Sequence, residues 1–99
     1  MLEDMPEIAK EISDNLDKYF PTEERRIRQV LVVMEECGEF AAAFRRANGM
    51  ARQTGSWKEV REELADVIIS AFVAAHVLNI DLECEVQDKI RTIMSRGGY

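Results

Sequence analysis

Apolar residues recur at every third or fourth position along most of the chain, with charged residues between them. This spacing is typical of an amphipathic helix. Proline occurs only twice, and helix-forming alanine, leucine, isoleucine, glutamate and arginine are plentiful. The pattern therefore predicts an all-α fold of four helices, over residues 3–20, 23–47, 56–78 and 82–95.

Local signals mark the boundaries of these helices. Pro21 ends the first one. Ser56, followed three residues later by Glu59, fits a capping box at the start of the third. The segment 48–55 contains two glycines and predicts a loop, and a turn over 79–81 precedes the fourth helix.

The two central helices are apolar almost all the way round, which is normally the mark of a buried helix. We expect them to pack antiparallel through the Met34/Ala41 and Ala65/Phe72 regions. A chain of 99 residues buries a limited core by itself, so the surplus apolar surface predicts a homodimer or homotetramer that completes the bundle. The strongest apolar stripe of the second helix comprises Ile27, Val30, Leu31, Met34, Cys37, Ala41 and Phe44.

Two groups of acidic residues interrupt these apolar helices: Glu35, Glu36 and Glu39, and then Glu62, Glu63 and Asp66. Residues three apart share a face of a helix, so each group presents a pair of carboxylates in one direction. Buried carboxylates are costly unless they are paired or bound to a metal. If the helices face each other, the acids converge and cannot all stay ionised without a cation. Oxygen-only ligands select hard cations, most naturally Mg²⁺, with Mn²⁺ as the other candidate.

Other kinds of catalytic site find little support. The single histidine, His76, points about 80° away from Asp66 on a helical wheel and is expected to be a core or interface residue. The absence of a Glu-x-x-His pair argues against a ferritin-like di-iron site. No serine, cysteine and histidine residues assemble into a convincing nucleophile set.

Length, charge and cysteine content narrow the function further. Residues 1–99 are expected to form a single domain, and the net charge of −6 argues against binding of a nucleic acid polymer. Cys37 and Cys84 lack a metal-binding spacing, which indicates two buried or half-buried thiols in a cytosolic protein. No signal peptide is evident, and the longest apolar run, 64–78, is too short and polar for a membrane span. We therefore expect a cytoplasmic protein without membrane contact.

Two basic residues near the carboxyl end are candidates for phosphate binding. Lys89 lies within the apolar stripe of the fourth helix, and Arg96 follows seven residues later on the same side. A lysine on a buried side needs an anionic partner, which the phosphates of a metal-bound substrate would supply. The alternatives are an ion pair with Glu85, four residues earlier, or a side chain that extends to the edge of the helix.

These motifs resemble the MazG-type, all-α nucleoside triphosphate pyrophosphohydrolases. The chain contains MEECGEFAAAF followed by REELADVIISAFVAAHVLNID. This is similar to the signature of that family, which is EExxE, a spacer and then ExxD. Here the signature occupies 35–39 and 63–66, with residues 40–62 as the spacer. The resemblance covers roughly residues 26–96.

The resemblance implies a four-helix MazG-like bundle and a reaction. A ribo- or deoxyribonucleoside triphosphate would be hydrolysed between its α and β phosphates to a nucleoside monophosphate and pyrophosphate. Glu35 would be an additional ligand or would orient the attacking water, and Lys89 and Arg96 would contact the phosphates. The family often has an asparagine four residues after this lysine, where the chain has Ile93. The implied metal ligands are Glu36, Glu39, Glu63 and Asp66, and the candidate catalytic residues are Glu35, Glu36 and Glu39.

Two other hypotheses remain open at the level of sequence. One is a non-catalytic helical interaction module, because rows of charges are usually solvated; the position of the acids inside apolar runs argues against it. The other is a metal-dependent enzyme that acts on a different phosphorylated metabolite. Melting with and without Mg²⁺ separates the module from an enzyme, since a crowded acidic site gains stability when it binds the metal and a solvated face barely responds.

Overall fold

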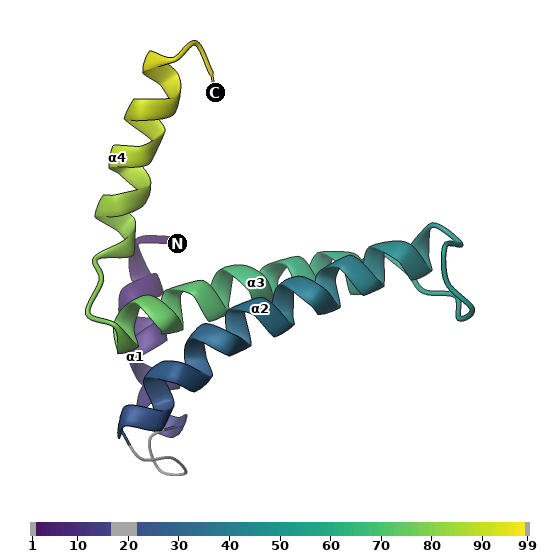
Figure 1. The fold of residues 1–99 in the computed structure, drawn as a ribbon, viewed down its shortest axis with the longest axis horizontal. Helices are drawn as coiled ribbons and strands as arrows, with labels where there is room; N and C mark the ends of the chain where they lie inside the picture. The colour runs from purple at the N-terminus through teal and green to yellow at the C-terminus, as the bar shows by residue number, and fades with distance from the viewer. Residues whose placement is uncertain (1, 17–21, 99) are drawn as a thin grey trace.

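The computed structural model describes residues 2–16 and 22–98, and the regular structure within these ranges is helical throughout. The predicted all-α fold is confirmed, and the bounds of the second, third and fourth helices agree with the prediction to within one residue. Residues 17–20, the expected last part of the first helix, and its expected end at Pro21 lie outside the described ranges. The elements are η1 (Leu2–Asp4), α1 (Met5–Leu16), α2 (Thr22–Ala47), α3 (Trp57–Val77) and α4 (Leu82–Ser95) (Figure 1).

The long helices α2 and α3 form the predicted antiparallel pair (Figure 1). Contacts across the closed end of this hairpin hold them together. The rings of Phe44 and Trp57 meet edge to face, with centroids 5.9 Å apart, and Arg46 Nη2 lies 3.4 Å from Glu59 Oε2. Gly55 lies so close to α2 that a Cβ atom there would approach the Cβ of Arg46 to 2.8 Å. A larger residue at this position would therefore push the loop away from α2.

Both α3 and α4 begin with a side-chain cap. Ser56 Oγ accepts a hydrogen bond from the backbone N–H of Glu59 at 3.3 Å, and Asp81 Oδ1 accepts one from that of Cys84 at 3.1 Å. Each cap satisfies one of the N–H groups that the first turn of a helix leaves without an intrahelical partner. The Glu59 carboxylate, which would complete the predicted capping box, contacts Arg46 instead.

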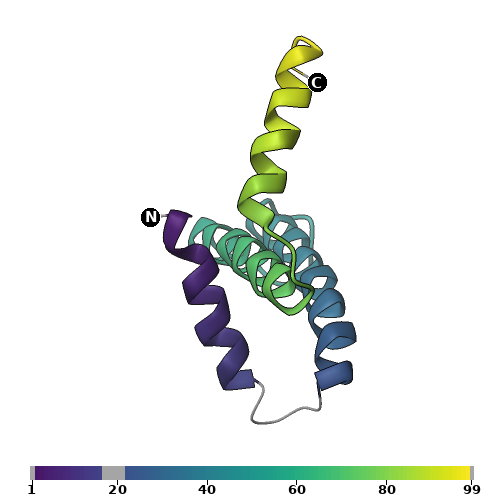
Figure 2. The same ribbon diagram turned by 90° about the vertical axis from the view of Figure 1, so that its left-hand side faces the viewer.

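The buried core is small and lies where α1 crosses the C-terminal half of α3 (Figure 2). The two helices contact each other mainly through small side chains, which allow a close approach of their axes. This contact places α1 over one end of the α2/α3 pair. The buried residues at this crossing are Met5, Ala9 and Ser13 from α1, and Ser70, Val73, Ala74 and Ala75 from α3, while Gln29, Ala43 and Val60 are buried between α2 and α3.

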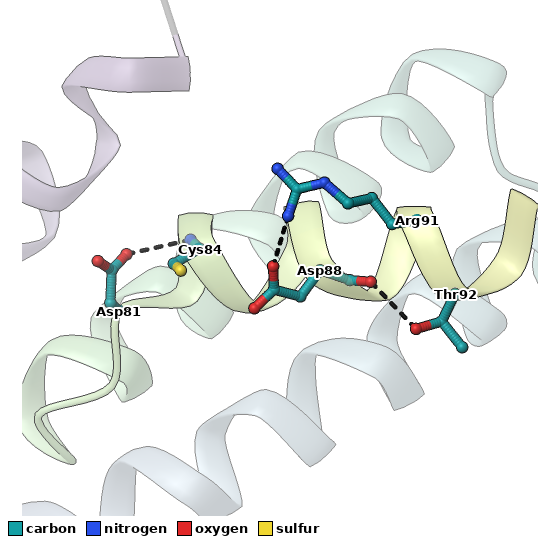
Figure 3. Close-up of polar contacts among 5 residues, drawn as sticks. All are labelled: Asp81, Cys84, Asp88, Arg91 and Thr92. Carbon is teal, nitrogen blue, oxygen red and sulfur yellow. Dashed lines mark hydrogen bonds and ion pairs between the residues drawn. The ribbon is translucent and has the colours of Figure 1, made fainter.

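The last helix, α4, projects from the end of α3 and packs along none of the other helices (Figures 1 and 2). Its polar contacts are local, as Figure 3 shows: the Asp81 cap, an ion pair of 2.8 Å between Arg91 and Asp88, and a hydrogen bond from Thr92 to the backbone oxygen of Asp88. No other helix of residues 2–16 and 22–98 covers its apolar side. The exposed apolar residues of α4 include Val86, Ile90 and Met94.

The predicted packing of α2 on α3 through Met34, Ala41 and Ala65 is wrong. All three residues are exposed, and Met34 has 71% of its surface accessible. Because both helices carry apolar residues all round, apolarity could not single out the face that packs. The seam between the helices, meaning the line along which α2 and α3 face each other, contains Gln29, Glu36, Ala43, Val60, Glu63 and Ser70.

The strongest apolar stripe of α2 is consequently exposed along its whole length. On α3, Leu64 and Ile68 are also exposed. Cys37 lies on the α2 stripe and Cys84 on the uncovered α4, so the prediction that both thiols are at least half-buried is wrong as well. Apolar surface of this extent marks an interaction site rather than an ordinary solvated face.

Among the described helices, none is by itself both long and apolar enough to cross a membrane; only α3 and α4 taken together reach that length and composition, with a bend of 115° between them.

Candidate functional site

Three carboxylates meet at the seam between α2 and α3. Glu36 and Glu39 lie one turn apart on α2, and Glu63 reaches them from α3. Each residue offers a carboxylate oxygen, and the three oxygens lie within 4.8 Å of one another. The structure therefore brings together three of the four predicted metal ligands in one group, which we call the acidic cluster.

The register of the helix pair explains why these residues meet. Gln29 Nε2 donates a hydrogen bond of 3.3 Å to the backbone oxygen of Ser70, which aligns α2 with α3 at this point. Glu36 follows Gln29 by seven residues, and Glu63 precedes Ser70 by seven residues. Seven residues are close to two helical turns, or about 10.5 Å. In an antiparallel pair, both glutamates thus return to the seam at the same level.

Two oxygens of the acidic cluster are buried without a partner. Neither Glu36 Oε2 nor Glu63 Oε2 has a hydrogen-bond partner within the described part of the chain. Burial raises the pKa of Glu36, and the charges of Glu39, Asp66 and Glu35 raise it further. Burial also raises the pKa of Glu63, with added contributions from the charges of Glu39, Asp66 and Glu36 and from a hydrogen bond with Glu39. A cation at this point would satisfy the buried oxygens and relieve the repulsion.

Asp66 and Glu35 lie at the edge of the acidic cluster. Both are exposed, and Asp66 follows Glu63 by one turn of α3. The charge of each raises the pKa of Glu36, so both are within electrostatic reach of the cluster. Two accessible carboxylates therefore stand beside a cluster in which Glu36 and Glu63 are half-buried and Glu39 is exposed.

A groove of about 320 Å³ opens next to the acidic cluster, and α1, α2 and α3 each contribute to its lining. Glu36 and Asp66 line it, whereas Arg25 and Arg28 line it two to three turns away, near the start of α2. The surface between them is mainly apolar. This volume lies at the lower end of the range of about 300–1,000 Å³ that is usual for small-molecule sites. A small organic group can therefore be bound directly beside the acids.

Gln29 is a residue of this groove that the sequence patterns did not single out. Only 7% of its surface is exposed. The available signal was its spacing, since a residue seven positions before Glu36 lies on the same face of α2. That signal identifies the face, but only the structure shows that α1 turns it into a groove.

Within one chain, the structure does not bring Lys89 and Arg96 to the acidic cluster. Both residues are exposed, and α4 points away from the seam (Figure 1). The predicted contact of Lys89 with the carboxylates or with substrate phosphates therefore stays a prediction, since α4 does not pack along α2 among the described residues. The alternative ion pair between Lys89 and Glu85 is not among the salt bridges of the described residues either.

Other polar candidates also lie away from the acids. His76 is half-buried and lines a separate hollow with Pro6 and Phe72, in line with the prediction of a core or interface role. Arg45 and Arg52 line a shallow hollow beside the loop at the closed end of the hairpin. No residue of the acidic cluster lines this hollow.

Comparison with known proteins identifies the family of this chain. A family model for the MazG nucleotide pyrophosphohydrolase domain matches residues 24–96. The chain belongs to the MazG family. The match takes in nearly all of α2, all of α3 and α4, and every acidic residue of the site. No curated protein and no solved structure gives a match.

Membership of the MazG family confirms the resemblance found in the sequence and places the chain in a family of nucleotide pyrophosphohydrolases. MazG domains generally depend on a divalent metal. The residues present here fit such an ion, because the acidic cluster supplies only carboxylate oxygens and two of them are buried without partners.

Proposed function

We propose that this MazG protein hydrolyses nucleoside or deoxynucleoside triphosphates between the α and β phosphates, in a reaction that requires Mg²⁺ and accepts Mn²⁺. A water oxygen forms a bond to the α phosphorus, and the bond from that phosphorus to the bridging oxygen breaks. The products are a nucleoside monophosphate and pyrophosphate. The observation that supports this proposal most strongly is the pair of buried, unpartnered oxygens of Glu36 and Glu63.

In this proposal Glu36, Glu39, Glu63 and Asp66 hold the metal. Mg²⁺ supplies charge neutralisation at the phosphoryl oxygens and activation of water. Glu35 stands exposed beside Glu36, where its carboxylate orients the attacking water and accepts its proton. The groove beneath α1 keeps part of the substrate away from solvent.

The same proposal includes a homodimer or homotetramer. The exposed stripe of α2 and the uncovered side of α4 are apolar surfaces that a second copy of the chain would bury. Lys89 and Arg96 can contact the phosphates only if α4 of one copy lies beside the acidic cluster of another. The role of these two residues therefore depends on assembly. The proposal also includes a single domain over residues 1–99 and a cytoplasmic location.

Pyrophosphate release from a panel of nucleoside triphosphates tests the reaction. Glu39→Gln and Asp66→Asn should each lower kcat by about 100-fold or more, because each removes a carboxylate oxygen from the metal site. Glu11→Gln, an exposed glutamate of α1, is the matched control and should leave kcat unchanged.

The stability of the same variants separates a functional site from a structural one. Glu39→Gln should raise the melting temperature of the metal-free protein, since it removes a charge that repels Glu36 and Glu63. Loss of a structural ion pair would lower it. Near-normal hydrolysis by both variants in Mg²⁺ would show that these carboxylates are not the metal site.

A further inference from the structure

The groove beside the acidic cluster contains a polar group that the metal site does not use. Gln29 lies on its lining with its side chain almost completely buried. The backbone oxygen of Ser70 can only accept a hydrogen bond, so the side-chain nitrogen of Gln29 must face it. The amide therefore has a fixed orientation, with Oε1 turned away from Ser70.

Oε1 of Gln29 is available to a ligand. Within the described part of the chain, no residue donates a hydrogen bond to it, and it is not among the fully buried unpartnered oxygens either. At least part of its surface is therefore exposed, and Gln29 lines the groove. One of the two Nε2 hydrogens is used by Ser70, whereas both lone pairs of Oε1 remain, so the amide offers the groove more acceptor than donor capacity.

The spacing between Gln29 and the acids suits one part of a nucleotide. The two positions are seven residues apart on α2, or about 10.5 Å. A nucleotide spans a length of this order from its α phosphate to the far edge of its base. Half-buried apolar side chains such as Val32 line the interval and would contact the faces of a base or sugar.

We propose that this groove binds the nucleoside part of the substrate and that Gln29 is a specificity-determining residue that contacts the base. This inference rests on the proposed function, since the acids must hold the phosphates for the base to reach Gln29. Because Ser70 fixes the amide, a base that presents an exocyclic amino group to Oε1 gains a hydrogen bond. A base that presents a keto oxygen places two acceptors against each other, and sites of this kind discriminate strongly.

The first test compares base preference in three forms of the protein. Wild type should prefer ATP and CTP, or their deoxy forms, over the GTP and UTP counterparts, because the amino group at position 6 of adenine and position 4 of cytosine is replaced by a keto oxygen at the same positions of guanine and uracil. Gln29→Met has a similar length but neither donor nor acceptor, and it should reduce the ratio of kcat/KM between preferred and rejected bases by tenfold or more. Gln87→Met changes an exposed glutamine of α4 and should keep the wild-type ratio. A folded Gln29→Met protein that keeps the wild-type preference would overturn the proposal.

A second variant covers the case in which Gln29→Met does not fold. Val32→Phe places a ring in the groove and removes no hydrogen bond. It should raise KM for all triphosphates by tenfold or more and leave kcat within a few-fold of wild type. An unchanged KM in this variant would show that the substrate does not occupy the groove.

Binding of AMP, CMP, GMP and UMP to the metal-free protein distinguishes failure of this inference from failure of the proposed function. The side-chain NH₂ signal of Gln29 in an NMR spectrum is identified by its loss in Gln29→Met. A shift of this signal with AMP or CMP, together with no release of pyrophosphate from any triphosphate, would contradict the proposed hydrolysis and support the nucleoside site. Pyrophosphate release without any such shift would contradict the nucleoside site alone.

Discussion

At the residue scale, the fold places two glutamates of the acidic cluster, Glu36 and Glu63, in an unfavourable environment. Each has a buried oxygen without a partner and a raised pKa. A group of this kind costs stability when it is ionised and no cation is present. The cost indicates function, because nothing in the packing of α2 on α3 requires carboxylates at these positions.

These raised pKa values predict how stability depends on pH. The folded state binds protons more tightly than the unfolded state at Glu36 and Glu63. The stability that these two groups contribute to the folded state is therefore fully present below their unfolded pKa. It is lost as pH rises through their folded pKa. Metal-free protein should therefore lose stability as pH rises from the ordinary glutamate range towards neutrality. Urea unfolding between roughly pH 5 and pH 8 measures this.

The matched comparison for the pH experiment is Glu36→Gln, which should flatten the dependence. Mg²⁺ should flatten it as well, because the cation favours the ionised carboxylates that a rise in pH creates. The same pH dependence in wild type and Glu36→Gln would contradict the assignment of the raised pKa to the acidic cluster. Melting that does not respond to Mg²⁺ would favour the hypothesis of a solvated acidic face.

The convergence of three predicted carboxylates, those of Glu36, Glu39 and Glu63, followed from the sequence for a physical reason. The spacing of Glu36 and Glu39 fixes their common direction on any helix, so their convergence requires only that α2 and α3 face each other there. Gln29 escaped prediction because its role comes from Ser70 and from α1, which are distant in the sequence. The role of Lys89 stays a prediction, because α4 packs along no other described helix that would fix its direction.

At the element scale, the ends of the helices followed from the sequence and their faces did not. Ser56 and Asp81 cap α3 and α4 through bonds that span three residues, and such signals are local. The packed face of α2 could not be predicted in this way. Apolarity favours the stripe centred on Met34, whereas the face that packs on α3 contains Gln29 and Glu36. The more polar face packs, and the more apolar face is exposed.

Gly38 provides a test at the scale of one helix. It lies in the middle of α2, and no heavy atom of the described chain lies within 4 Å of the Cβ that alanine would add. Gly38→Ala should therefore raise the free energy of unfolding by about 1 kcal/mol through helix propensity alone. Chemical unfolding measures the change, and Ala41→Gly, at an exposed position of the same helix, should lower it by a similar amount.

Hydrolysis by Gly38→Ala should stay at the wild-type level if the site needs no close approach at this backbone. A fall in stability or activity would instead indicate that another helix or the substrate contacts α2 at Gly38, between the two ligands of the cluster. The two outcomes decide whether this glycine is only tolerated or is required.

At the scale of the whole molecule, the main feature is apolar surface without a cover. Ile27 and Met94 are 66% and 68% exposed, and they lie on helices that point in different directions (Figures 1 and 2). A closed symmetric assembly buries both kinds of surface in every copy. It would also bring α4 of one copy to the hairpin of another, where Lys89 can meet the phosphates.

Mixing of two inactive variants tests whether a site is shared between copies. Lys89→Ala keeps the acids, and Glu39→Gln keeps the lysine. If Lys89 acts on the neighbouring copy, a refolded equimolar mixture should recover about a quarter of wild-type activity, because half of the dimers are mixed and each has one complete site. Pyrophosphate release measures the recovery, and each variant alone is the control.

Lys89→Ala alone should lower kcat/KM by an order of magnitude or more, since charged contacts to phosphate are strong. Full activity in this variant would remove Lys89 from the site. Loss of activity without recovery in the mixture would show that Lys89 does not act across an interface. Light scattering that detects only a monomer of 11.4 kDa would contradict the assembly itself.

The alignment of α2 with α3 at Gln29 and Ser70 has a consequence for how this chain can vary in length. The level of the acids along the seam is counted in helical turns from that point, and one residue inserted between Glu63 and Ser70 would turn the glutamate by about 100° out of the seam. The exposed stretch 50–54 of the hairpin loop has no part in that count. Insertions, fused tags or new chain termini are therefore best tolerated there, whereas a residue added to or removed from α2 or α3 would displace the acids from the seam.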